Sequence, residues 1–105
     1  MDFSIITKAD LTYKEAAALL GVSPVAIHKY LRCGAEPRET YRGQPLAKWI
    51  GHTLAVLEEL VTRGKLPLPY PKLTKDVEVR AKRAADMEKI KHHIEQKVAL
   101  KLANA

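Results

Sequence analysis

The chain has few of the residues that form cross-links, and it lacks long apolar runs. Cysteine occurs once, as Cys33, so neither an intramolecular disulfide nor a cysteine-rich zinc site can form within the chain. No apolar run approaches the ~18 residues of a membrane span. The opening segment MDFSIITKAD has no basic leader followed by an apolar stretch. We therefore expect no membrane partner and a cytoplasmic location.

Aromatic residues are also scarce, at 6% of the 105 residues, whereas Ala, Leu, Lys and Glu are abundant. These four residue types lose little entropy in a helix, so the composition predicts an all-α chain with a single core. The 18 Lys and Arg residues exceed the 12 Asp and Glu residues and give a net charge of +6. This charge favours a polyanionic partner, although basic proteins that bind no nucleic acid have similar values.

Two short helices are predicted on either side of Gly21. Thr12 is an N-cap residue with Glu15 three positions later, a spacing typical of a capping box, so the first helix begins near residue 13. Gly21 adopts positive φ easily and ends this helix. Ser23 caps a second helix, and Pro24 occupies its first position, where the missing N–H costs nothing. The second helix runs to about residue 31.

Three segments surround this helix pair. Residues 1–10 are predicted to form a short arm. The polar stretch 35–44 is predicted to be a loop, with one short extended segment at 40–42. The next segment, PLAKWIGHTLAVLEELVTRG, has apolar residues at helical spacing between an initial proline and a final glycine. It predicts the most secure helix outside the pair.

The last third of the chain is predicted to be a connector and one long helix. Alternate prolines in KLPLPYPKL favour an extended linker over 67–74. No Gly or Pro follows, so a helix is predicted from Lys75 to Leu102, with Thr74 as its cap. The expected organisation is a helix-turn-helix domain at 1–66, this linker, and a long helix at 75–105 that serves oligomerisation or packing.

The long helix carries a narrow apolar stripe, and its other faces are charged. The stripe needs a partner, which is either the globular part of the chain or the same helix of a second copy. We therefore expect a homodimer through this helix as one of the two arrangements. The stripe consists of Val77, Ala81, Ala84, Met87, Ile90, Ile94, Val98 and Leu102.

The helix pair meets the steric demands of a helix-turn-helix. Ala17 leaves room for the second helix to cross closely, Gly21 makes the turn, and Val22 and Ile27 point inward. An ordinary helical hairpin, in which Gly21 only ends a helix, is the alternative. Such a hairpin needs neither the small residue nor a cluster of polar and cationic residues on one short helix.

The segment YKEAAALLGVSPVAIHKYLRCG resembles the helix-turn-helix of excisionase-like and MerR-like regulators of phage or bacterial origin. The resemblance covers residues 11–34 and implies a bacterial cytoplasmic or nucleoid location. In these families a wing and then a helix often follow, and YRGQPLAKWIGHTLAVLEEL is similar in layout. No clear pair of strands is predicted around Gly43, so a wing stays an open alternative.

The resemblance implies that residues 24–32 enter the major groove of double-stranded DNA. Ser23 would bond phosphate oxygens, Val25 would meet a thymine methyl group, and His28 or Lys29 a base edge. Arg32 is suited equally to contact a base edge or the DNA backbone. The implied contacts are Ser23, Pro24, Val25, His28, Lys29 and Arg32, with Lys14, Arg38 and Arg42 as flanking phosphate contacts.

The sequence predicts no metal site, cofactor, small-molecule ligand or catalytic residue. His92 and His93 are adjacent and point about 100° apart on a helix, unlike ligand pairs at four-residue spacing. Cys33 has no His and Asp arrangement nearby and is expected to be a small packed residue. We therefore do not expect an enzyme.

Two other features have structural readings. Trp49 adjoins Ile50 on the inner face of a patterned helix and is expected in the core rather than stacked on bases. Arg80, Lys82 and Arg83 either touch phosphate or form a solvated face, because acidic residues are interspersed with them.

Three functions follow from these observations. The first is a dimeric, sequence-specific regulator of phage or mobile-element type whose two recognition helices meet half-sites one DNA turn apart. The second is a DNA-packaging adaptor that resembles a phage small terminase and assembles into a ring. The third is a module whose long helix binds a host protein, with the helix pair as scaffold.

Overall fold

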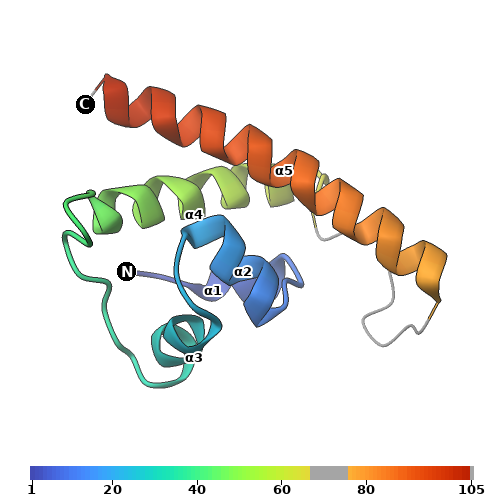
Figure 1. The fold of residues 1–105 in the computed structure, drawn as a ribbon, viewed down its shortest axis with the longest axis horizontal. Helices are drawn as coiled ribbons and strands as arrows, with labels where there is room; N and C mark the ends of the chain where they lie inside the picture. Colours follow the sequence, from blue (N-terminus) through green and yellow to red (C-terminus); the bar gives the residue numbers. More distant parts are fainter. Residues whose placement is uncertain (67–75, 105) are drawn as a thin grey trace.

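A computed structural model of the chain describes residues 1–66 and 76–104. Within these ranges the chain forms five α-helices and no β-strand, which confirms the all-α prediction. The connector predicted over 67–74 lies outside the described residues. No described helix combines the length and the hydropathy needed to cross a membrane. The helices are α1 (Ser4–Lys8), α2 (Tyr13–Leu20), α3 (Pro24–Arg32), α4 (Leu46–Thr62) and α5 (Val77–Ala103) (Figure 1).

Residues 1–10 contain helix α1 and are not the arm that the sequence predicts. Phe3, Ile6 and Ala9 recur at three-residue spacing and are all buried, so this segment presents one apolar face to the core. The Phe3 ring also stacks on Tyr30 of α3, with the ring centroids 4.9 Å apart. A helix of five residues is not stable alone, so these tertiary contacts hold α1 in place.

Helices α2 and α3 begin where their capping residues predict. Thr12 Oγ1 accepts a hydrogen bond from the Glu15 N–H (3.1 Å), and Glu15 Oε1 accepts one from the Thr12 N–H (2.9 Å), which completes the capping box. Gly21, with a φ of 73°, ends α2. Ser23 Oγ accepts a hydrogen bond from the Ala26 N–H at 3.2 Å and caps α3.

Small and aliphatic side chains fill the space between α2 and α3. Ala16, Ala17 and Leu20 of α2 are buried, and Ile27 of α3 is completely buried. Val22, in the turn, packs against the same cluster. The inward positions predicted for the two helices are therefore confirmed.

Helix α4 presents the broadest apolar face to the core. Ile50, Leu54 and Leu57 are buried at the three- and four-residue spacing of one helix face. Thr53 is buried beside them, and its hydroxyl donates a hydrogen bond to the Trp49 carbonyl at 2.8 Å, so its polar group is satisfied. Trp49 itself is half-buried and packs at the edge of the core.

Helix α5 lies across α4 and α2 and covers the core (Figure 1). Ile94 and Val98 are completely buried, and Met87 and Ile90 pack against the same cluster. The apolar stripe from Met87 onward therefore packs against the chain's own helices. At the start of α5, Val77 stays 76% exposed.

The start of α5 differs from the prediction by two residues. The helix begins at Val77 because Asp76 caps it: one carboxylate oxygen of Asp76 accepts a hydrogen bond from the Glu78 N–H at 2.8 Å. Thr74, the cap that the sequence predicts, lies outside the described residues. With 27 residues, α5 is about 40 Å long.

Candidate nucleic-acid interface

Helix α3 has one face in the core and one face in solvent. Ile27 is completely buried, and Tyr30 and Leu31 pack partly against the core. The opposite face carries polar and cationic side chains. All nine residues for which the sequence predicts DNA contact are exposed: Ser23, Pro24, Val25, His28, Lys29, Arg32, Lys14, Arg38 and Arg42.

The first turn of α3 combines an apolar side chain with a free hydroxyl proton. The Val25 side chain is 63% exposed. Ser23 Oγ accepts the hydrogen bond from Ala26, and its proton stays available to an anionic oxygen. Lys29 and Arg32 lie in the last turn. The exposed face therefore changes from apolar to cationic along the helix.

An aromatic residue of α2, which the sequence pattern did not single out, joins this face. Arg32 Nε donates a hydrogen bond to Tyr13 Oη at 3.5 Å, and the Tyr13 and His28 rings lie edge to face with centroids 6.1 Å apart. The hydrogen bond raises the pKa of the Arg32 guanidinium above its usual value. No local signal predicts this cluster, because Tyr13 and Arg32 are 19 positions apart.

Several cations around α3 lack acidic partners. Within residues 1–66 and 76–104, the side chains of Lys14, Lys29 and Arg38 form no ion pair. By contrast, Lys97 of α5 lies 3.6 Å from Glu59 of α4. The positive charge beside α3 is therefore uncompensated, and its field attracts anions.

A tight turn, and not a pair of strands, follows α3. The Tyr41 N–H donates to the Gln44 carbonyl at 2.9 Å, and the Gln44 N–H donates to the Tyr41 carbonyl at 3.0 Å. Arg42 and Gly43 both have positive φ, 52° and 79°. The Arg42 guanidinium lies over the Tyr41 ring, 5.2 Å from its centroid. The turn thus presents one cation at its tip.

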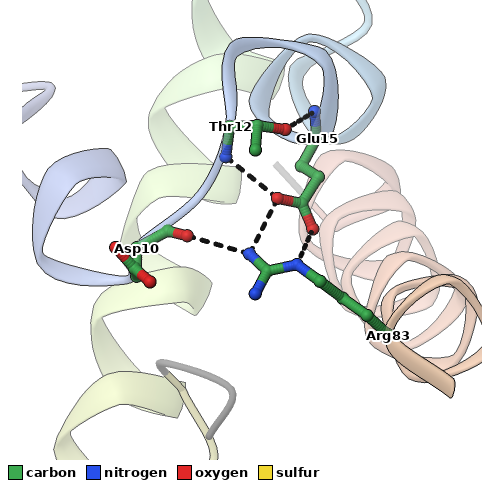
Figure 2. Close-up of polar contacts among 4 residues, drawn as sticks. All are labelled: Asp10, Thr12, Glu15 and Arg83. Carbon is green, nitrogen blue, oxygen red and sulfur yellow. Dashed lines mark hydrogen bonds and ion pairs between the residues drawn. The ribbon is translucent and has the colours of Figure 1, made fainter. Parts of the chain in front are cut away.

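Arg83 is not part of the basic surface, although the sequence allowed it as a phosphate contact. Its Nε donates to Glu15 Oε2 at 3.1 Å, and its Nη2 donates to Glu15 Oε1 at 2.9 Å and to the Asp10 carbonyl at 3.0 Å (Figure 2). Both charged side chains are only 16% exposed. Arg83 therefore fixes α5 to the capping box of α2.

The ion pair also shifts the titration of its two members. Burial alone would raise the pKa of Glu15, but the hydrogen bonds from Arg83 and Thr12 and the charge of Arg83 outweigh it, so the pKa lies below the usual 4.5. The same contact raises the pKa of Arg83. Both groups are consequently charged at neutral pH.

Other chemistry is not evident in the described part of the chain. The residues that the structure describes contain no group of three or more His, Cys, Asp or Glu side chains placed to hold a metal ion. Cys33 is exposed, unlike the packed residue that the sequence predicts.

No family model matches the sequence, and no curated protein or solved structure shows a significant match to it. The functional argument therefore depends on the geometry of α3 and its surroundings.

Proposed function

We propose that this chain is a sequence-specific regulator of phage or mobile-element type that binds double-stranded DNA. In this proposal α2, Gly21 and α3 act as a helix-turn-helix, and α3 enters the major groove, which is wide enough for one helix. Val25 meets a thymine methyl group, His28 and Lys29 meet base edges, and Ser23 donates to a phosphate. This function requires no cofactor and no catalytic residue.

The observation that carries the proposal is the division of α3 into two faces. The buried Ile27 fixes the helix against α2, so the opposite face is held outward without depending on its own side chains. On that face the cations lack acidic partners, and Lys14 and Arg38 extend the positive charge beyond α3. A duplex carries one negative charge per ~1.7 Å of axis, which complements such a surface.

We propose further that the protein acts as a homodimer through α5. Two copies related by a two-fold axis would present two α3 helices to half-sites about one turn, ~34 Å, apart. Because the stripe from Met87 onward is covered within the chain, contact between copies would use residues that stay exposed. Val77 and Leu100, at 76% and 64% exposed, are the large apolar candidates on α5.

The decisive experiment is the selection of bound sites from random duplexes, with the oligomeric state of the same protein measured in parallel. One enriched palindrome bound by a dimer is the expected result. Random sites bound by a ring-sized species would favour a packaging adaptor instead. Absence of duplex binding would overturn the proposal and leave α5 as the functional surface.

Single substitutions then separate the roles of individual contacts. Lys14→Gln should weaken binding to all duplexes alike and reduce the slope of log K against log salt by about 0.9. His28→Ala should relax the preference at one base pair, at a cost of about 1–3 kcal/mol on the selected site. Lys89→Gln, an exposed cation on α5, is the matched control and should leave both properties unchanged.

A further inference from the structure

Two adjoining hollows lie on either side of Gly21 and the turn at 41–44, one beside α3 and the other between the end of α2, the start of α4 and the end of α5. The first has a volume of about 540 Å³ and is bordered by Val25, Lys29 and Arg38. The second has a volume of about 320 Å³ and ends at Leu102 of α5. Gly21, Tyr41 and Leu46 line both hollows, so together they form one elongated depression, the α3 groove.

The floor of the α3 groove is apolar at the end nearest α4. Leu20, Pro45 and Leu46 line it, with the Trp49 indole and Leu102 as walls. Trp49 packs only partly into the core, so part of its indole surface faces the groove. An apolar ligand would therefore cover surface that water now contacts.

The other end of the groove is cationic. Lys29 and Arg38 border the first hollow, and their side chains form no ion pair with described residues. Arg42 lies at the tip of the turn and borders the second, mainly apolar hollow. Glu36 is the acidic residue on this rim, and the amino group of Met1 pairs with it at 2.9 Å. The net charge along the rim is positive.

We propose that the α3 groove binds a carboxylate with a medium-length acyl chain. The acyl chain of the ligand would lie along the floor of the groove toward Trp49 and Leu102. Its carboxylate would accept charge-assisted hydrogen bonds from Lys29 and Arg38. Ligand sites commonly have volumes of about 300–1,000 Å³, apolar linings and a few polar groups that fix orientation. The elongated shape favours an acyl chain over a compact ring, and the rim charge favours an acid over an alcohol.

Occupation of the groove has a regulatory consequence. Lys29 and Arg38 also belong to the proposed DNA surface, so the carboxylate and a duplex compete for the same cations. The acid would thus release DNA. This consequence rests on the proposed function, whereas the binding site itself does not.

The test uses Trp49, which is the single tryptophan of the chain. The full chain is titrated with sodium octanoate, and 1-octanol serves as the uncharged probe of the same chain length. Octanoate should shift the Trp49 emission to shorter wavelength and reach saturation, because the acyl chain removes water from the indole. Octanol should bind about three- to tenfold more weakly, since it makes no ion pair.

Variants assign the carboxylate to its cations. The double variant Lys29→Gln and Arg38→Gln should weaken octanoate binding roughly tenfold and leave octanol binding unchanged. Lys65→Gln, an exposed cation beyond α4, is the control and should bind octanoate normally. The site is refuted by an unsaturable or absent shift, by equal binding of octanol, or by an equal loss in the control variant.

A competition assay separates this inference from the proposed function. If octanoate binds and displaces the selected duplex, the groove inference and the proposed function are both supported. If the protein binds duplex and octanoate produces no shift, the groove inference fails alone. If octanoate binds and no duplex does, the site stands and its regulatory role is removed.

Discussion

The Tyr13 phenol connects the first turn of α2 with the outer face of α3. Its hydrogen bond draws the Arg32 side chain toward the start of α2, where Lys14 also lies. Under the proposed function, this geometry favours a contact of Arg32 with the DNA backbone, for which the sequence left base and backbone open. His28 meets the same phenol only through an edge-to-face ring contact, with the centroids 6.1 Å apart, and keeps its proposed role at a base edge.

Tyr13→Phe is therefore expected to weaken duplex binding about two- to tenfold, because one hydrogen bond that orders Arg32 is lost. The salt dependence should not change, since the charge of Arg32 is retained. Arg32→Gln should instead reduce the salt slope by about 0.9. Equal binding by wild type and Tyr13→Phe in fluorescence anisotropy would show that the phenol does not order Arg32.

The pair of Glu15 and Arg83 should stabilise the fold measurably. Arg83→Met is expected to lower the free energy of unfolding by about 1–3 kcal/mol at neutral pH, because Glu15 loses two hydrogen bonds. One buried guanidinium nitrogen of Arg83, Nη1, has no partner among the described residues, which limits the net contribution of the pair. Urea unfolding measures the change, and Lys89→Met on the same helix should differ from wild type by less than about 0.5 kcal/mol.

The same pair predicts a pH dependence of stability. The folded-state pKa of Glu15 lies below its usual 4.5, so the contribution of this group is fully present above that pH and is lost as the pH falls through the folded value. Urea unfolding across the acidic range should show a decline in stability below about pH 4.5 that is shallower in Glu15→Gln. Parallel profiles for the two proteins would contradict the role of Glu15.

At the level of elements, local rules predicted the helices with strong caps. Thr12, Glu15, Ser23 and Pro24 act within three positions of their partners, so sequence spacing alone located α2 and α3. Helix α1 was missed because five residues are too few for a helical period to appear, and burial of its face in the tertiary structure decides its conformation.

The inward face of α5 provides a matched pair of substitutions. Ile94→Ala should destabilise the protein by about 2–5 kcal/mol, because a completely buried side chain leaves a cavity between α5 and α4. Leu100→Ala, less than two turns along the same helix and 64% exposed, should change stability by less than about 0.5 kcal/mol. If the two substitutions changed the free energy of unfolding in urea by similar amounts, α5 would not pack as described.

For the molecule as a whole, α5 and the first four helices share one cluster of buried residues. Thermal unfolding should therefore be a single cooperative transition. The far-UV circular dichroism, to which α5 contributes strongly, and the fluorescence of Trp49 on α4 should change together. An earlier loss of the helical signal would indicate that the long helix unfolds on its own.

Contacts between distant positions mark the limit of prediction from this sequence. The exposed face of α3 follows from its helical period, and the five expected residues within the helix are exposed there, as are the four expected around it. The partners of Arg83 and Tyr13 do not follow, because 68 and 19 positions separate the residues in contact. The α3 groove depends on how the turn at 41–44 and the end of α5 approach α4, which no local pattern specifies.

The late position of Ile94 and Val98 in the sequence has a consequence for synthesis. These side chains cover α4, yet about thirty residues must be added after Leu66 before they leave the ribosome's active centre. At about 5–20 residues per second, the apolar face of α4 is synthesised roughly 1.5 to 6 seconds before the residues of α5 that cover it. During that interval the apolar face of α4 has no cover from α5, and exposed surface of this kind favours aggregation.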